Sequence, residues 1–369
     1  MKKILAVFSL ICMIFTSFEV GAIETGAKSF ILVNAETMGV ISGKDYNVKL
    51  PMASTTKIMT ALILAEKNTP QKTVKVTKEM IAVEGSSMGL LEGDIVGYND
   101  LLYGMLLSSG NDAANVTAIE LAGSLENFSK IMNNKAKEIG LKNTNFVTPS
   151  GLDTENHYST AYDLALLTSY ALKNEAFKKA VSSYKATLNY GNPPYRRTLT
   201  NHNKLLVEFE DAIGVKTGFT KKAGRCLVSA AERDGKIVIC VTLKDANDWK
   251  DHEKLLNLGL NSVVNYTPKL QNEKQSLSVL GGQKDSVNIG YNLDSICLLE
   301  DEIQDFSFKI HYNSNLFAPI YKDQVVGKIT YHLNNRIIKS VNITAKETVN
   351  GVEVSGFNKF LCYLKLLLN

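Results

Sequence analysis

Residues 51–64 read Pro51-Met52-Ala53-Ser54-Thr55-Thr56-Lys57-Ile58-Met59-Thr60-Ala61-Leu62-Ile63-Leu64, with a hydroxyl and an amine three residues apart at the start of an apolar, helix-forming run. Side chains at positions i and i+3 of a helix lie on one face, about 5–6 Å apart at Cβ. The Lys57 amine can therefore reach the Ser54 hydroxyl and take its proton, which would activate the serine as a nucleophile. The spacing is common by itself, and a solvated helix N-terminus with Ser54 as the N-cap is the better explanation of an isolated match. Other motifs must decide between these interpretations.

A second polar motif, Ser109-Gly110-Asn111, separates two apolar helical stretches at 101–107 and 113–121. Polar groups at i and i+2 of a tight turn can face one cleft, with Gly110 supplying the backbone freedom. The serine hydroxyl can relay a proton, and the asparagine amide offers both a donor and an acceptor. The alternative is a plain helix boundary with Asp112 as the N-cap of the second helix.

The third motif is Lys216-Thr217-Gly218, which follows a strand-like segment and precedes Phe219. A cation beside a hydroxyl is suited to holding a carboxylate, and Gly218 permits another backbone to approach closely. If this strand lies at the edge of a sheet, it can also pair with an extended peptide. The alternative is a solvated lysine near a turn.

The two ends of the chain predict an exported protein that lies on a membrane. Residues 1–22 have a basic start, an apolar middle and small residues at the end, as in a secretory signal peptide, and the predicted cleavage site follows Ala22. Residues 356–369 carry apolar side chains at helical spacing together with Lys359 and Lys365. This predicted helix is shorter than the roughly 20 residues that a membrane span needs. We therefore expect it to lie on the membrane surface, with docking on the protein's own core as the alternative.

Composition excludes some classes of function. After removal of 1–22 the chain holds 39 basic and 36 acidic residues, and no basic tract with interleaved aromatic residues indicates nucleic-acid binding. If Asp234-Gly235 forms a two-residue hairpin turn, Cys226 faces Leu243 and Cys240 faces Ser229, so these two cysteines do not pair. Free, buried thiols are expected, and no histidine and cysteine cluster has metal-ligand spacing.

The pattern of the chain predicts an α+β fold followed by a second domain. Strand patterns at 29–34 and 40–43 precede the Ser54 helix, a helical middle follows, and strand patterns return near Ile213 and over 225–231 and 236–243, before a helix from about 248 to 264. A sheet built from both ends of the region, with the helical middle packed on it, is an α+β arrangement. Short alternating runs after 275 indicate a small all-β sandwich. The predicted divisions are a signal peptide (1–22), an α+β domain (23–266), a linker (267–275), a β-sandwich domain (276–355) and an amphipathic helix (356–369).

The three motifs together are the set shared by class A β-lactamases and penicillin-binding proteins. In motif order and surrounding residues, including 53–61, 100–114, 157–165 and 214–220, the chain resembles the low-molecular-mass penicillin-binding proteins. These are the serine D-alanyl-D-alanine carboxypeptidases, peptidase S11-like, of bacterial cell-wall maturation. The resemblance implies a transpeptidase-type α+β domain, a location at the extracytoplasmic face of the cytoplasmic membrane, and no cofactor or metal.

By this resemblance Ser54 is the nucleophile that forms an acyl-ester with the penultimate D-alanine of a peptidoglycan pentapeptide stem. Lys57 would accept its proton. Ser109 and Asn111 would pass the proton to the leaving amine and hold the peptide amide. β-Lactam antibiotics would acylate the same serine and leave slowly.

The resemblance also implies the substrate-binding side of the site. Lys216 and Thr217 would bind the terminal carboxylate beside Gly218, and the backbone N–H groups of Ser54 and Phe219 would form the oxyanion hole. The family often adds a further basic residue to this task. Lys244 and Lys250 are the sequence candidates for it.

Three other functions stay open. Gly110, where class A β-lactamases have aspartate, favours the carboxypeptidase branch. A β-lactamase or a transpeptidase would use the same site. A non-catalytic wall-binding protein would keep the fold without the reaction.

Overall fold

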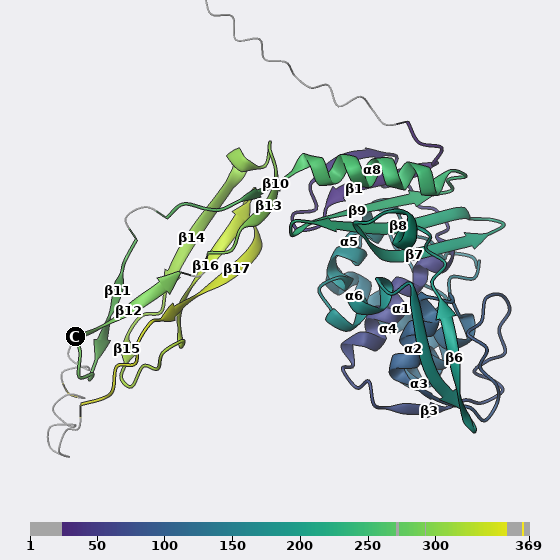
Figure 1. Ribbon diagram of the computed structural model, residues 1–369, viewed down its shortest axis with the longest axis horizontal. Coiled ribbons are helices and arrows are strands. Elements are labelled where there is room, and N and C mark those ends of the chain that lie inside the picture. The colour runs from purple at the N-terminus through teal and green to yellow at the C-terminus, as the bar shows by residue number, and fades with distance from the viewer. Residues whose placement is uncertain (1–23, 271–272, 292, 353–363, 365–369) are drawn as a thin grey trace, which may run out of the picture.

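The computed structural model describes residues 24–270, 273–291, 293–352 and 364 (Figure 1). An N-terminal domain of mixed helix and strand is followed by a C-terminal domain of strands. The predicted signal peptide (1–22) lies outside the described residues, and so does the predicted C-terminal helix (356–369) apart from Leu364.

The N-terminal domain is organised around a five-stranded antiparallel sheet in the order β2-β1-β9-β8-β7. The strands are β1 (Ser29–Asn34), β2 (Val40–Lys44), β7 (Ala212–Thr220), β8 (Gly224–Arg233) and β9 (Lys236–Leu243). Because β1 pairs with β9, the two ends of the domain meet in the middle of the sheet, as predicted. β7 is an edge strand.

The β8–β9 hairpin has the predicted register. Cys226 lies opposite Leu243 and Cys240 lies opposite Ser229. The turn residues Asp234 and Gly235 both have positive φ, 53° and 77°, as a type I′ turn requires. The three described cysteines are free and buried, as expected.

Helices cover both faces of the sheet (Figure 1). One face packs on α1 (Lys57–Glu66), α2 (Tyr98–Leu106), α3 (Asn111–Ala122), α4 (Leu125–Ile139), α5 (Ala161–Ala171) and α6 (Glu175–Val181), and the other on α8 (Asp248–Ser262). In β1, Ile31 and Val33 join the first core while Phe30 and Leu32 join the second. This two-sided burial explains why β1 is apolar at successive positions.

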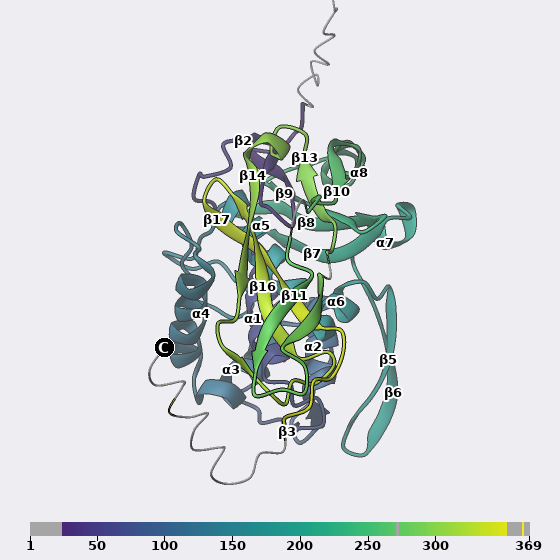
Figure 2. The same ribbon diagram turned by 90° about the vertical axis from the view of Figure 1, so that its left-hand side faces the viewer.

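Several elements of this domain were not predicted. They are β3 (Thr73–Lys75), β4 (Ile95–Gly97), the helices α6 and α7 (Leu205–Glu208), and the hairpin of β5 (Lys185–Gly191) and β6 (Pro194–Thr200), which extends along one side of the domain in Figure 2. The hairpin is fixed to the domain at Tyr190, whose hydroxyl donates to the Met88 carbonyl at 2.7 Å.

The C-terminal domain is all-β, as predicted. Its six-stranded sheet has the order β14-β16-β17-β12-β11-β15. The strands of this sheet are β11 (Ser276–Leu280), β12 (Ser286–Tyr291), β14 (Phe306–Tyr312), β15 (Leu316–Phe317), β16 (Val325–Leu333) and β17 (Arg336–Ala345), and a further strand, β13 (Ile296–Leu299), lies outside it. Asn334 and Asn335 form the predicted turn between β16 and β17, with φ of 48° and 65°. One apolar core, which includes Val287, Ile329 and Ile343, lies within this domain.

The predicted helix from about 248 to 264 ends earlier, at Ser262, because the chain continues as β10 (Val263–Tyr266) and pairs with β13. Side chains near the end of β1 add to this junction. The Asn34 amide donates to the Cys297 carbonyl at 2.8 Å, and the Cys297 N–H donates to Glu36 at 2.8 Å. Backbone pairing and hydrogen bonds therefore join the two domains.

Candidate active site

Ser54 and Lys57 meet at the start of α1. Ser54 lies in a 3₁₀ turn, Ala53–Thr56, and Lys57 is the first residue of the helix that follows. The Lys57 ammonium nitrogen donates to Ser54 Oγ at 3.0 Å. The spacing in the sequence therefore places these two side chains together, although through a 3₁₀ turn and not through a regular α-helical turn.

Lys57 is fully buried, and its partners are fixed. Its Nζ also donates to Asn111 Oδ1 and to the Ser150 carbonyl, both at 2.7 Å. Burial lowers the pKa of Lys57 well below its usual value, the nearby Lys216 charge lowers it further, and Asp112 partly opposes both. Desolvation favours the neutral amine, which is the form able to accept a proton.

The turn Ser109-Gly110-Asn111 lies between α2 and α3, beside Lys57. The unusual backbone conformation is at Ser109, whose φ is 55°, and not at Gly110, whose φ is −58°. Gly110 is required for a different reason, because a Cβ there would lie 2.6 Å from Asp112 Oδ1 and 3.0 Å from Met88 N. The assignment of backbone freedom to Gly110 was therefore wrong, while Asn111 does reach Lys57 through its side chain.

Asp112 does not cap α3 with its own side chain but holds a neighbouring loop. Its carboxylate accepts from the backbone N–H groups of Met88, Gly89 and Leu90 at 2.9–3.1 Å and from the Ser87 hydroxyl at 2.5 Å. The N–H of Asn111 also donates to the carbonyl of Ser86, at 2.7 Å. This loop, which sequence reasoning missed, forms one wall of the site.

His157 contacts the turn that carries Ser54 through a hydrogen bond to Thr56. Its Nδ1 accepts from the Val147 N–H at 3.0 Å, so Nε2 carries the proton and donates to Thr56 Oγ1 at 2.8 Å. Thr56 in turn donates to the Ala53 carbonyl at 2.8 Å. Burial lowers the pKa of His157 to about 4, so it is neutral at pH 7.

The motif Lys216-Thr217-Gly218 lies on β7, the edge of the sheet facing the Ser54 turn. Lys216 is buried, its Nζ donates to the Thr217 carbonyl at 2.8 Å, and burial lowers its pKa to about 7. A Cβ at Gly218 would lie 3.0 Å from Ser54 N and 3.1 Å from Thr55 N. Glycine is needed here because the two backbones approach so closely.

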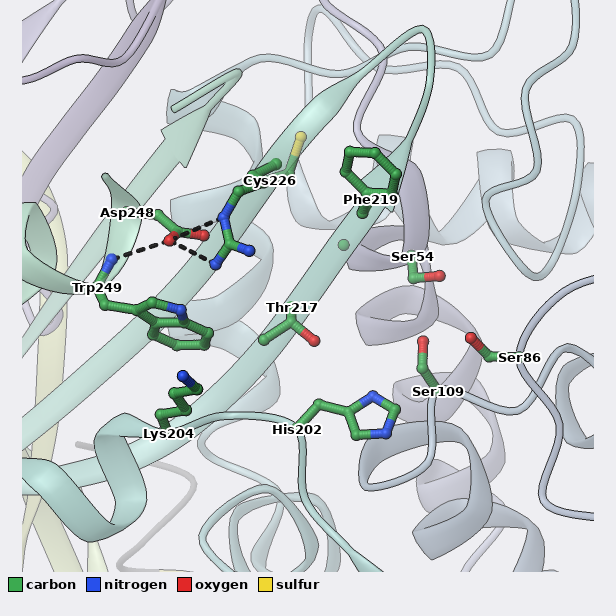
Figure 3. A pocket seen from close by; sticks show the side chains of 12 residues that line it. Ser54, Ser86, Ser109, His202, Lys204, Thr217, Phe219, Cys226, Asp248 and Trp249 are labelled. Atoms are coloured by element: carbon green, nitrogen blue, oxygen red, sulfur yellow. Dashed lines mark hydrogen bonds and ion pairs between the residues drawn. The ribbon is translucent and has the colours of Figure 1, made fainter. Parts of the chain in front are cut away.

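These elements enclose a cavity of about 410 Å³ (Figure 3). Its lining residues are Ser54, Ser86, Ser109, His202, Lys204, Thr217, Gly218, Phe219, Arg225, Cys226, Asp248 and Trp249. Five of the eight predicted site residues line it, and Lys57, Asn111 and Lys216 lie buried behind the surface. All eight therefore gather around one cavity.

The basic side chains at the cavity differ from the two candidates taken from the sequence. Neither Lys244 nor Lys250 lines it, whereas Arg225 does. Nε and Nη2 of Arg225 donate to Asp248 Oδ1 at 3.1 and 2.7 Å, so its guanidinium is held in place (Figure 3). The signal available in the sequence was the position of Arg225 opposite Phe219 across the β7–β8 hairpin.

Comparison with known proteins decides the family. A family model described as D-alanyl-D-alanine carboxypeptidase matches residues 16–247, and the model of the C-terminal domain of penicillin-binding protein 5 matches residues 266–351. The chain belongs to the D-alanyl-D-alanine carboxypeptidase family. DacF of Bacillus subtilis, one of its relatives, is 31% identical over 91% of this chain and 88% of its own. DacC of Escherichia coli is 32% identical over 92% of this chain and 87% of its own length.

Solved structures agree with this membership. The D-alanyl-D-alanine carboxypeptidase DacD of Francisella tularensis has a TM-score of 0.63 at 27% identity, covering 90% of this chain and 95% of that one. The Streptomyces K15 DD-transpeptidase has a TM-score of 0.62 at 32% identity, covering 64% and 98%. The prediction of a serine D-alanyl-D-alanine carboxypeptidase, with an α+β domain followed by an all-β domain, is confirmed.

Proposed function

We propose that this D-alanyl-D-alanine carboxypeptidase uses Ser54 as its nucleophile and Lys57 as the general base. The observation that carries the proposal is the 3.0 Å contact between Lys57 Nζ and Ser54 Oγ, within a buried environment that lowers the pKa of the amine. A nucleophile and a base within hydrogen-bonding reach are the expected arrangement for covalent catalysis.

The reaction proceeds through an ester on Ser54. As Ser54 Oγ bonds to the carbonyl carbon of the penultimate D-alanine, the C–N bond to the terminal D-alanine breaks. The proton from Ser54 passes by way of Lys57 and Ser109 to the leaving amine. Water then hydrolyses the ester and regenerates the serine, while Asn111 holds Lys57 and the peptide amide.

The substrate's terminal carboxylate binds at the β7 end of the cavity. Thr217 offers a hydroxyl, Lys216 contributes a nearby positive charge when protonated, and Arg225 supplies a second cation on the cavity wall. Arg225→Gln should raise KM for peptides with a free C-terminus more than for the same peptides amidated. Lys250→Gln is the matched control, because Lys250 does not line the cavity. Equal effects of the two variants would contradict the role of Arg225.

The oxyanion hole is formed by the backbone N–H groups of Ser54 and Phe219. The support for it is the close approach of β7 to the Ser54 turn at Gly218. Preorganised N–H donors of this kind stabilise the charge that develops on the carbonyl oxygen. β-Lactams would acylate Ser54 through the same geometry.

We also propose that the protein is exported by its signal peptide and attaches to the extracytoplasmic face of the cytoplasmic membrane through 356–369. The pattern of apolar residues and lysines in the sequence supports this. Among the residues that the structure describes, no helix has the length and apolar character to cross a bilayer.

The likeness to the Streptomyces K15 DD-transpeptidase keeps a transpeptidase as the second candidate. It would use the same ester on Ser54 and transfer it to an amine of another wall peptide. Release of D-alanine compared with transfer to an added amine separates the two, since hydrolysis dominates in a carboxypeptidase.

The decisive experiment is mass spectrometry of the mature chain after incubation with labelled penicillin, together with D-alanine release from a pentapeptide ending in D-Ala-D-Ala. We expect one adduct, on Ser54, and loss of adduct and release in Ser54→Ala. Ser182→Ala, at an exposed serine after α6, should behave as wild type. D-Alanine release by Ser54→Ala at the wild-type rate would refute the mechanism. Rapid nitrocefin turnover would indicate a β-lactamase, and peptide binding without an adduct a wall-binding protein.

A further inference from the structure

Apolar side chains are exposed at one end of the C-terminal domain. Leu280, Phe317, Tyr321, Val325 and Val352 have exposed fractions of 42%, 51%, 61%, 46% and 47%. We call these five residues the tip patch. Single exposed apolar side chains are ordinary, but a group of them on one end of a domain marks an interaction surface.

The strand pattern shows that the patch is not a by-product of core packing. Along β11 the inward positions are Leu277 and Val279, and the outward positions are Ser276, Ser278 and then Leu280. An outward position on a solvated strand is normally polar, so Leu280 breaks the pattern only at the tip. The same change occurs where buried Leu316 is followed by exposed Phe317 and buried Ile320 by exposed Tyr321.

The members of the patch lie on neighbouring segments. Leu280 and Phe317 are direct partners across the parallel pairing of β11 and β15. The Val352 N–H donates to the Gly281 carbonyl at 2.9 Å, next to Leu280. In Figure 1 β15 lies at the end of the C-terminal domain away from the N-terminal domain.

The occupant of this surface is indicated by the chain that leaves it. Val352 is the last residue before 353–369, whose sequence carries Phe357, Phe360, Leu361 and Leu364 at helical spacing with two lysines. Within the patch, Tyr321 is followed by exposed Lys322, and an aromatic ring next to a cation in the sequence suits a membrane interface. If residues 353–369 lie on a membrane surface, the tip patch next to Val352 would face the same surface.

We propose that the tip patch rests in the interfacial layer of an anionic lipid bilayer, next to the point where the C-terminal segment enters it. This inference rests on the proposed membrane attachment and adds a second contact, made by the folded domain. Two contacts would fix the domain's orientation on the membrane, whereas the tail alone would leave it free to pivot.

The test uses the mature full-length chain and vesicles of phosphatidylcholine with phosphatidylglycerol. Leu280→Ser with Phe317→Ser should weaken co-sedimentation about tenfold, because two partly inserted apolar side chains are lost. The matched control is Ile337→Ser, which removes a side chain that is 58% exposed on β17. Ile337 follows Arg336, which donates a hydrogen bond to the carbonyl of Thr37 in the N-terminal domain. Ile337 therefore lies at the end of the C-terminal domain that faces the N-terminal domain, and this control should bind as wild type.

A second measurement separates insertion from tethering. A nitroxide label at Phe317→Cys, in a Cys362→Ser background, should become shielded from a water-soluble relaxation agent when vesicles are added, and a label at Ile337→Cys should not. If the label at 317 stays exposed and the double serine variant binds as wild type, the proposal is overturned while attachment by the tail stands. If the double variant loses a dimer on gel filtration but keeps its vesicle binding, the patch binds a second copy, and the proposal is equally overturned.

Failure of the enzymatic proposal would be visible separately. D-Alanine release from a soluble pentapeptide should be the same in wild type and in the double serine variant, because Leu280 and Phe317 belong to the C-terminal domain, whereas every residue that lines the cavity belongs to the N-terminal domain. Loss of vesicle binding with unchanged D-alanine release supports the lipid contact without depending on the assignment of Ser54.

Discussion

Replacement of Lys216 by methionine should stabilise the protein while it removes activity. Burial lowers the pKa of Lys216 from 10.5 to about 7. Below pH 7 this lysine is charged in both states, but the charge costs free energy in the buried native site and not in the solvated unfolded chain. At about 1.4 kcal/mol per pH unit, this difference destabilises the native state by about 5 kcal/mol. Loss of the donor to the Thr217 carbonyl costs about 1–3 kcal/mol. Lys216→Met should therefore gain about 2–4 kcal/mol at pH 6.

The sign of the pH dependence makes this prediction specific. The folded pKa lies below the unfolded one, so the unfavourable contribution is complete below pH 7 and disappears as the pH rises toward 10.5. The gain in the free energy of unfolding that Lys216→Met brings should therefore be about 3 kcal/mol smaller at pH 9 than at pH 6.

Urea denaturation followed by circular dichroism at the two pH values measures this difference. The exposed Lys142→Met should change the free energy of unfolding by less than about 0.5 kcal/mol at either pH. An advantage of Lys216→Met that is independent of pH would refute the reasoning, because it would come from packing and not from the buried charge.

Three further predictions follow from single contacts. Gly218→Ala would place a Cβ 3.0 Å from Ser54 N and so displace the nucleophile. Acylation by a fluorescent penicillin should become about tenfold slower. Gly351→Ala, whose new Cβ would have its nearest neighbour at 3.8 Å, should leave the acylation rate unchanged. Asp112→Ala removes the acceptor of three loop N–H groups and should cost about 3 kcal/mol or more in urea denaturation, with Asp112→Asn recovering part of it. The pKa of His252 is lowered to about 3 by burial, so the unfolded state takes up its proton first as the pH falls below 6.5. Between pH 7 and pH 5 the wild type should lose about 2 kcal/mol more than His252→Gln, and equal losses would contradict this.

Much of the fold could be predicted because it depends on local pattern. The Asp234-Gly235 turn between β8 and β9 fixes a register in which Cys226 lies opposite Leu243. The β5–β6 hairpin was missed although Leu188, Tyr190 and Leu199 are buried. Its contacts are with a distant loop, as in the hydrogen bond from Tyr190 to Met88, and a single sequence does not show those contacts.

The residues of the site likewise include some that could be predicted from local spacing and others that depend on distant contacts. Ser54 and Lys57 could be paired from their spacing, because both belong to one turn of chain. Arg225 was missed because its place beside the cavity depends on the β7–β8 register and on Asp248 at the start of α8. Lys244 and Lys250 are near the motif in the sequence, yet neither lines the cavity.

The role of burial is the part of the site that a sequence cannot supply. Lys57 and Lys216 are ordinary lysines in the sequence, and each becomes chemically distinct because a different segment removes it from water: Lys57 donates to the Ser150 carbonyl, and Lys216 lies on a strand closed off by the Ser54 turn. Their mutual repulsion lowers the pKa of Lys57 further. Two buried amines destabilise the fold, and the proposed mechanism gives each a use, since Lys57 must be neutral to accept a proton while Lys216 binds an anion. A substrate carboxylate that reaches Lys216 would favour the charged form of that amine, so binding of the substrate would offset part of the free energy that burial of this lysine costs.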